Sequence, residues 1–426
     1  DWALKVGAVR MTEDNDAINQ RLQSSGAGIN ADGSGVQYAD FATDFDATKI
    51  GLDMNLTGRF EALSMPQEIM LGSNYSKFKS DDKFARTFNN SSDTISDIDH
   101  HRPEISYEGL LNTVGGRATL SKYDIRQKGI YGSWRVKPIE PLTLVLGSRV
   151  SWYDYSYKWA DQQAFANVAT TNAPSTMSEN GEVTPYAGIV YDLNREWAVY
   201  ASYTDVFEPQ TARTVSGSVL KPVIGSNYEI GLKGELMDGR VNTSLALFRY
   251  DQENRAVNDM ASRFACDDWY CSTASGKVRS QGLDAEISGE VLDGLQLFAG
   301  YTYNTTKYLD DPDNEGKTVS TWTPKHMLRV WSDYQFSGDF SRVSTGLGFT
   351  TQSHTLGYEH TYEVPGYTVW NARLGYQATP EIGLALNANN LFDKHYYSAG
   401  YNQLNGNNYF GEPRNLMFSV KYTPTF

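Results

Sequence analysis

Side chains that could support catalysis or bind a metal are few and scattered in this sequence. It contains no glycine-rich phosphate loop, no HExxH pair and no paired-cysteine zinc spacing. His100 and His101, with Asp97 and Asp99 beside them, can hold a metal weakly, and a solvated loop explains the same residues. No nucleophile can be paired with a base. We therefore predict a protein that is not an enzyme and that has no cofactor or metal site of its own.

Aromatic side chains are the more abundant source of binding chemistry, because Phe, Trp and Tyr make up 13% of the 426 residues. Many of them gather near the ends of predicted strands, where a girdle at a membrane interface is the alternative explanation. Around residue 155 the two explanations separate. Trp152 has the opposite parity to Tyr153, Tyr155, Tyr157 and Trp159, so these five cannot all face lipid. The candidate ligand-binding residues are Trp152, Tyr155, Trp159, Trp322, Tyr401 and Tyr409.

The elements that must position these aromatics are strands, and the final segment shows the pattern most clearly. Four apolar residues of one parity, Leu416, Phe418, Val420 and Tyr422, alternate with polar ones such as Ser419 and Lys421. One face of this strand is therefore apolar and the other polar. Because the composition cannot fill the interior of so large a soluble barrel, we place the apolar face outward, toward lipid.

About sixteen segments follow this pattern, and short turns alternate with long polar loops between them. That layout is typical of an all-β, transmembrane, antiparallel up-and-down β-barrel, in which lipid forbids an open sheet edge. A soluble β-sandwich also alternates, but it does not separate short from long connections so cleanly. The predicted strands lie near residues 1–12, 46–61, 65–79, 126–138, 141–158, 183–192, 197–207, 227–237, 240–254, 278–291, 295–308, 325–336, 341–352, 367–377, 382–394 and 414–426.

Composition argues against several other classes of protein. The net charge is −14, which argues against a nucleic-acid partner. No run of about eighteen apolar residues is present, so a membrane-spanning helix is not expected. The first residues are already strand-like and do not resemble a signal peptide.

Several motifs resemble the TonB-dependent outer-membrane receptors of Gram-negative bacteria, in the branch of ferric coprogen and ferripyoverdine receptors. The C-terminal motif is Asn390, Leu391, Phe392 and Asp393, followed by Pro413 and Arg414 and by a strand that ends on Phe426. Residues 200–210, 227–234 and 324–329 resemble the same branch. The resemblance implies a barrel of about 22 strands around an N-terminal plug. Residues 1–426 are then a partial barrel domain, without the plug and the first strands.

The resemblance also implies partners and a ligand. The family takes up ferric siderophores with energy from the TonB–ExbB–ExbD complex, and its terminal strand is the signal for the barrel-assembly machinery. Iron arrives already chelated, so aromatic faces and a few hydrogen-bond donors suit the ligand, which we expect to be of hydroxamate type. In this oxidising location Cys266 and Cys271 are expected to form a disulfide, either as a plain staple or to hold Trp269 and Tyr270 outward.

Three functions remain open from the sequence. The first is energised uptake of a ferric siderophore bound at the extracellular face. The second is passive diffusion through a complete sixteen-stranded porin, which predicts a constriction with opposed basic and acidic rows. The third is an outer-membrane barrel that only interacts with other molecules. The motifs favour the receptor, while the strand count alone favours the porin.

Overall fold

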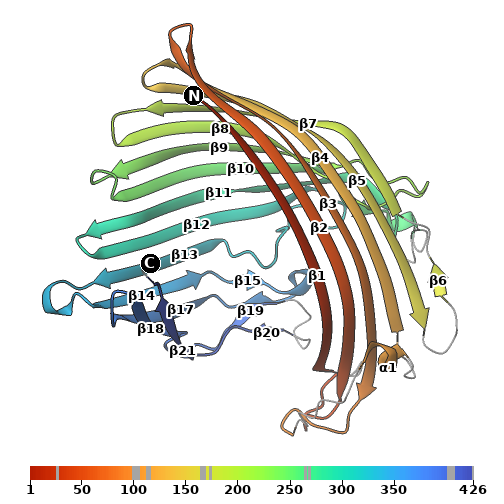
Figure 1. The fold of residues 1–426 in the computed structure, drawn as a ribbon. Coiled ribbons are helices and arrows are strands. Elements are labelled where there is room, and N and C mark those ends of the chain that lie inside the picture. Colours follow the sequence, from red (N-terminus) through yellow and green to blue (C-terminus); the bar gives the residue numbers. More distant parts are fainter. Residues whose placement is uncertain are drawn as a thin grey trace.

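The computed structural model is almost entirely β-sheet (Figure 1). It describes residues 1–24, 28–97, 106–111, 117–163, 169–171, 175–262, 266, 270–400 and 408–424. Within these residues, one antiparallel sheet of 17 strands includes a three-residue strand, β6 (Ala169–Thr171). The sixteen long strands are β1 (Trp2–Ser24), β2 (Val36–Ala62), β3 (Met65–Asn90), β4 (Arg117–Ile139), β5 (Leu142–Gln163), β7 (Ser175–Asp192), β8 (Trp197–Glu208), β9 (Val223–Leu236), β10 (Val241–Asn258), β11 (Ser272–Leu292), β12 (Leu295–Asp310), β13 (His326–Gln335), β14 (Val343–Gln352), β17 (Tyr367–Gln377), β18 (Ile382–Asn389) and β21 (Asn415–Tyr422).

Short elements lie in the connections. Two small hairpins pair β15 (Thr355–Leu356) with β16 (Glu363–Val364) and β19 (Tyr397–Ala399) with β20 (Tyr409–Phe410). The helical elements are α1 (Tyr107–Leu111) and the 3-10 helices η1 (Met260–Ser262), η2 (Gly338–Phe340) and η3 (Tyr358–His360). No helix among the described residues is long and apolar enough to cross a membrane.

The predicted strands are all present, but several predicted boundaries were wrong. β1 continues to Ser24, whereas the sequence predicts its end near residue 12, and β3 continues to Asn90 instead of residue 79. β4 begins at Arg117, in a stretch predicted as loop. In these extensions apolar residues no longer recur at every second position of one face, so backbone pairing continues although the regular apolar row has stopped. At the other end, β18 stops at Asn389 and does not continue to residue 394.

The short turns follow the backbone chemistry of tight hairpins. Leu63 and Ser64 join β2 to β3 with φ values of 56° and 59°, the left-handed pair of a type I′ turn. Pro66 lies in β3 opposite Glu61. Gly239, in the turn between β9 and β10, has φ 86°, which glycine adopts without strain.

Register identifies the two faces, because directly opposite residues of antiparallel strands share one face. Phe418 lies opposite Leu386, which in turn lies opposite Leu374, and these side chains are 65%, 42% and 54% exposed. This apolar, exposed row is the outer face expected to meet lipid. It continues around the sheet through Leu347, Leu247, Leu245, Ile230, Ile189, Leu146, Ile130, Leu71, Leu52 and Leu4.

The other face is polar and lines the lumen. Tyr131 on β4 donates to the carboxylate of Asp53 on β2 at 2.9 Å. The guanidinium of Arg149 on β5 donates to Asn74 on β3, also at 2.9 Å. Hydrogen bonds between strands thus fix polar side chains along the lumen wall, as expected for a barrel with a wet interior.

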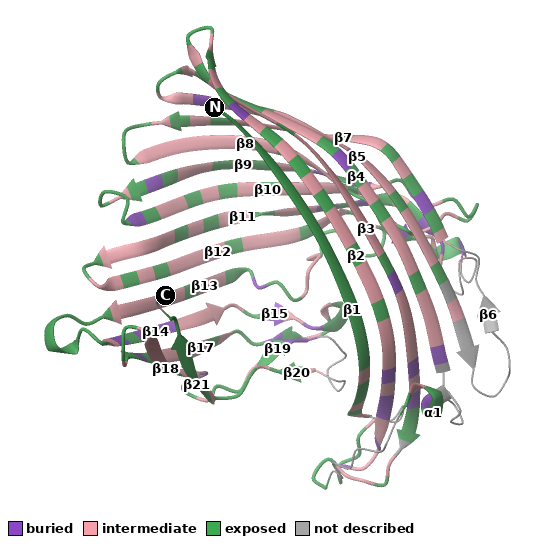
Figure 2. Cartoon of the chain, viewed as in Figure 1, coloured by how far each residue is buried: buried purple, intermediate pink, exposed green. Residues whose placement is uncertain are grey.

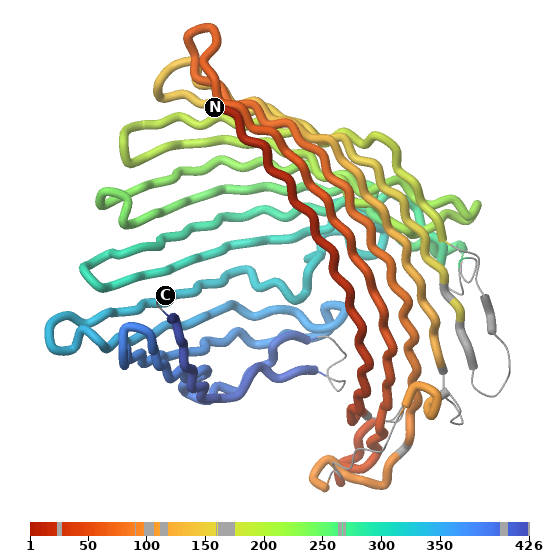
Figure 3. Tube along the Cα trace, in the orientation of Figure 1, coloured from red at the N-terminus to blue at the C-terminus, as the bar shows by residue number. Residues whose placement is uncertain are grey.

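The sheet is open along one side. Among the described residues, β1 pairs only with β2, and β21 pairs only with β18. The first strand (red) and the last strand (dark blue) are not adjacent in the trace (Figure 3). β1 is exposed along almost its whole length (Figure 2). Two strand edges with unpaired backbone groups therefore flank the opening.

Candidate functional site

The strongest cluster of predicted ligand-binding residues lies on β5, near the end of the sheet that carries the long loops. Tyr153, Tyr155 and Tyr157 have the parity of the lumen face, like Arg149 on the same strand. Trp152 lies opposite Lys128 and shares the outer face with Val150. The predicted split of these aromatics between two faces therefore agrees with the register, and it places Trp152 apart from Tyr155.

A tyrosine that the sequence reasoning missed completes the cluster. Tyr123 on β4 lies directly opposite Tyr157. Their ring centroids are 4.6 Å apart, and the rings of Tyr123 and Tyr155 meet nearly edge to face at 6.1 Å. Because β4 was predicted to begin only at residue 126, Tyr123 had no strand partner. Continuing the pairing register of the β4–β5 hairpin past Arg126 would have placed Tyr123 opposite Tyr157.

These rings form a surface that suits a bulky, partly apolar ligand. The lumen tyrosine wall, as we call it, consists of Tyr123, Tyr153, Tyr155 and Tyr157. All four side chains are partly exposed, so part of each is accessible from the lumen. Tyrosine offers an apolar ring and a polar tip at low conformational cost, properties that suit a binding surface.

The other predicted aromatics either lie in the loop region beyond the tyrosine wall or have side chains outside the described set. Trp159 pairs through its backbone with Ser121 on β4, and its side chain lies outside the described set. Trp322 is 51% exposed in the connection between β12 and β13. Tyr409 is 54% exposed on β20, where its carbonyl accepts from Ser398. The predicted residues that lie outside the described residues are Tyr401, Phe426, Asp99, His100, His101 and Trp269.

Two of the long loops contact one another at the rim of the sheet. The amide of Leu356 donates to the carbonyl of Thr321, beside Trp322, at 2.8 Å. A ring nitrogen of His360 lies 2.8 Å from the carbonyl oxygen of Thr318 in the same loop. The loop after β12 is therefore held against the loop after β14, which fixes the position of Trp322 at the rim.

A disulfide joins Cys266 to Cys271, with 5.0 Å between their Cα atoms. The next residue, Ser272, donates its amide to the carbonyl of Arg213 at 2.7 Å. The Arg213 guanidinium donates in turn to Ser175 at the start of β7. The cysteine loop is thus attached to the loop between β8 and β9.

The C-terminal motif is a structural hub. Asn390 is 2% exposed, and its side chain bonds the backbone of Lys394 and of Glu412. Asp393 accepts the Arg414 amide at 3.1 Å, and the two side chains lie 3.9 Å apart. The left-handed φ values of Asn390 (48°) and Asp393 (53°) explain the polar residue types there.

Among the described residues, no group of three or more His, Cys, Asp or Glu residues is placed to hold a metal ion. A ligand at the tyrosine wall would meet aromatic faces and hydroxyls instead.

Similarity to characterised proteins agrees with this geometry. The chain is 40% identical over 431 residues to the ferric-pyoverdine M114 receptor of Pseudomonas sp. strain M114, a match that covers 99% of the chain and 51% of that receptor. It is 34% identical to the ferripyoverdine receptor of Pseudomonas aeruginosa, over 87% of the chain and 44% of the receptor. The chain therefore spans about half the length of these relatives.

Solved structures show the same fold. The crystal structure of the Pseudomonas aeruginosa ferripyoverdine receptor bound to ferripyoverdine superposes with a TM-score of 0.78 and 30% identity, covering 99% of this chain and 54% of that one. The ferric-catecholate import receptor Fiu of Escherichia coli, at 21% identity, shares the fold with a TM-score of 0.79 over 99% of this chain and 62% of that one. The family model described as TonB dependent receptor-like, beta-barrel matches residues 1–391, and the chain belongs to this family of outer-membrane receptors.

Proposed function

We propose that this chain is the larger part of the barrel of a receptor that binds a ferric siderophore at its extracellular face. The observation that carries the proposal is 40% identity over 99% of the chain to a ferric-pyoverdine receptor. Uptake into the periplasm would draw energy from the TonB–ExbB–ExbD complex, which is the family's coupling partner. A ferric pyoverdine is thus the first ligand to test, and a ferric tris-hydroxamate, the class predicted from the sequence, is the second.

The lumen tyrosine wall would receive the ligand. A ferric siderophore saturates its own iron, so the protein needs aromatic faces and hydrogen-bond donors and does not need to ligate the metal. The wall lies at the extracellular end of the lumen and is built by a continuous hairpin, β4–β5. A site on paired strands holds its side chains more precisely than a site on loops.

Further barrel strands and a plug domain would complete the receptor beyond residues 1–426. The unpaired edges of β1 and β21 support this part of the proposal, because lipid tolerates no open sheet edge. The same edges argue against a porin closed by these sixteen strands alone. Assembly would use the barrel-assembly machinery, in keeping with the outward apolar row of β21.

The test is binding of iron-loaded and iron-free siderophores to the complete receptor, followed by quenching of tryptophan fluorescence. We expect sub-micromolar binding of one ferric siderophore and at least about a hundredfold weaker binding of its iron-free form. Absence of binding across the panel, together with ohmic conductance in a planar bilayer, would overturn the receptor proposal in favour of a pore.

A further inference from the structure

The strands β1 to β3 continue well beyond the apolar belt, which is the exposed apolar row of the outer face. β2 and β3 contain 27 and 26 residues, whereas β18 and β21 contain 8 residues each. On the outer face of this extension, α1 covers Ala42 and Ala85 (Figure 1). The opposite face continues the lumen side past the tyrosine wall, and Arg21 and Phe88 are exposed on it. We call this stretch the distal lumen face.

Three phenylalanine rings meet on the distal lumen face. The ring centroids of Phe41 and Phe84 are 5.7 Å apart, and the ring of Phe88 meets that of Phe41 edge to face at 6.4 Å. Phe88 is 44% exposed, and the other two side chains are partly exposed. Neighbouring apolar side chains that remain exposed outside the lipid belt are typical of interaction sites.

Two guanidinium groups lie over these rings. The guanidinium carbon of Arg21 is 4.9 Å from the ring centroid of Phe41, and that of Arg86 is 5.7 Å from the ring centroid of Phe88. A stacked guanidinium uses its flat face, so its N–H edge stays available to donate two parallel hydrogen bonds to an anion. We name these five residues the Phe–Arg patch: Phe41, Phe84, Phe88, Arg21 and Arg86.

Around the patch, no lumen-side position in the paired parts of β1 to β4 carries an acidic residue. The first carboxylate toward the membrane, Asp82, lies opposite Phe45 and Ser121. Among the described residues, no carboxylate forms an ion pair with Arg21 or Arg86. The whole chain carries −14, so this local excess of cations does not follow from composition. The lumen-side positions in the rows beyond Asp82 are Ala17, Thr43, Phe84 and Thr119, then Asn19, Phe41, Arg86 and Arg117, then Arg21, Ala39 and Phe88.

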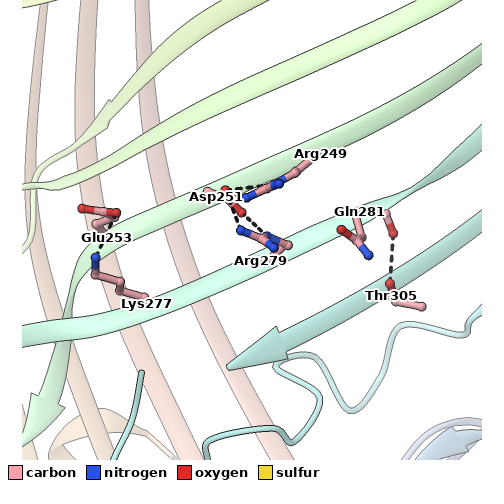
Figure 4. A network of polar contacts seen from close by, with 7 residues as sticks. All are labelled: Arg249, Asp251, Glu253, Lys277, Arg279, Gln281 and Thr305. Carbon is pink, nitrogen blue, oxygen red and sulfur yellow. Dashed lines mark hydrogen bonds and ion pairs between the residues drawn. The ribbon is translucent and has the colours of Figure 1, made fainter. Parts of the chain in front are cut away.

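Cations on β10 and β11 are arranged differently (Figure 4). There Asp251 binds Arg279 at 2.6 Å and Arg249 at 2.8 Å. Lys277 lies 3.1 Å from Glu253. The charge of those cations is balanced within the protein, whereas the arginines of the Phe–Arg patch have no such carboxylate among the described residues. Free N–H edges and uncompensated positive charge favour an anionic ligand at the patch.

We propose that the Phe–Arg patch is a second subsite for the ferric siderophore, and that it receives a carboxylate of the ligand. The guanidinium edges of Arg21 and Arg86 donate to the carboxylate, and the phenyl rings contact an apolar part beside it. Phe84 lies opposite Thr119, about 13 Å along β4 from Tyr123, so a ligand larger than its iron centre reaches both the patch and the tyrosine wall. This inference rests on the proposed function and adds that the receptor prefers siderophores with a free carboxylate.

The test uses the complete receptor and two probes, a ferric pyoverdine with free carboxylates and the same compound after its carboxylates are converted to amides. Stopped-flow quenching of tryptophan fluorescence gives the rate constants. For the carboxylate form, R21Q with R86Q is expected to raise the dissociation constant about tenfold, because two charge-assisted contacts are lost at an exposed site. For the amidated form, the same double variant is expected to change the dissociation constant by less than about twofold.

A matched control removes the same charge elsewhere. R59Q with R195Q changes one exposed arginine of β2 and one in the turn between β7 and β8, both at the end of the barrel opposite the long loops. It is expected to leave both dissociation constants within about twofold. A heat-modifiable band on electrophoresis verifies that each variant is folded.

A lysine variant separates a specific contact from a general attraction of charge. R21K with R86K keeps both charges, so the association rate constant is expected to keep its dependence on salt. Lysine lacks the planar fork, so dissociation of the carboxylate form is expected to be about fivefold faster than from the unmodified receptor.

The outcomes distinguish this inference from the proposed function. If no ferric siderophore binds the unmodified receptor, the proposed function fails and this inference fails with it. If the ferric pyoverdine binds, three results overturn the subsite alone: equal losses for the carboxylate and amidated forms in R21Q with R86Q, an equal loss in the control variant, or an unchanged dissociation constant in every variant.

Discussion

The side-chain amide of Asn390 donates to the backbone carbonyl of Glu412 at 3.0 Å, across 22 residues of chain. The same amide donates to the carbonyl of Lys394, and the side-chain oxygen of Asn390 accepts the Lys394 amide at 2.7 Å. One buried residue thus joins the end of β18 to the segment that leads into β21. The terminal strand is positioned by this connection as well as by its ladder with β18.

We predict that N390A destabilises the barrel by about 3 kcal/mol, because several buried backbone groups lose their partner at once and alanine disfavours the left-handed φ. Urea unfolding in lipid vesicles, followed by tryptophan fluorescence, measures the change. N389A is the control, since among the described residues the Asn389 side chain bonds to the Asn415 side chain and not to buried backbone groups. Its expected cost is about 1 kcal/mol. An equal loss of unfolding free energy in the two variants would contradict the structural role assigned to the Asn390 side chain.

Tyr155 lies on the lumen face of β5, whereas Trp152 lies on its outer face. We predict that Y155A weakens binding of the ferric siderophore about tenfold, because a large aromatic face is lost from the site. W152A, three positions away on the same strand, is expected to leave the dissociation constant unchanged because its side chain points to the opposite face. Fluorescence titration of the complete receptor measures both. A larger loss in W152A than in Y155A would refute the assignment of the two faces.

The sequence predicted the fold well where one face of a strand is apolar. The alternation from Leu416 to Tyr422 indicates an outward row, and the exposed fractions agree with it. Beyond the belt this signal vanishes, because the apolar residues of β1 after Thr12 (Ala17, Ile18 and Leu22) are few and lie on both faces, so period two can no longer be seen. Only the register of the paired strands carries the pattern further.

The site was predicted in part for the same reason. The parity on β5 placed Tyr155 on the face opposite Trp152, whereas the partner ring of Tyr123 depended on an unpredicted extension of β4. Helix α1 was missed because a five-residue helix in a polar loop has no periodicity to detect.

Helix α1 covers three small residues at the far end of the outer face. Ala42, Ala85 and Ala118 lie opposite one another on β2, β3 and β4, and each is at most 2% exposed under Leu110. We predict that A85L displaces α1, because the added atoms have no space at a position that is fully buried. Limited proteolysis is expected to cut the loop between β3 and β4 faster. A8L, on the exposed lipid-facing row, is the control and should leave the cleavage rate unchanged.

The cysteine loop offers a redox test. Reduction of the disulfide between Cys266 and Cys271 is expected to remove about 2 kcal/mol of stabilisation from this small loop. Proteolytic cleavage near η1 should therefore accelerate. The barrel's own unfolding midpoint should remain unchanged, since the disulfide joins no two strands of the sheet. C266S with C271S should reproduce the effect without reductant. A lower unfolding midpoint after reduction would show that the loop also supports the barrel.

Tyr107, partly buried against the cluster beneath α1, gives the docking of that helix a dependence on pH. Burial raises the pKa of its phenol above the ordinary value of 10.0. When α1 is undocked, the phenol ionises near pH 10, whereas in the docked state it stays neutral to higher pH. The contribution of Tyr107 is therefore complete below pH 10 and is lost as pH rises through the raised pKa. Proteolysis of the loop between β3 and β4 should accelerate above pH 10, and Y107F should abolish that acceleration. Equal alkaline sensitivity in Y107F would assign the effect to another group.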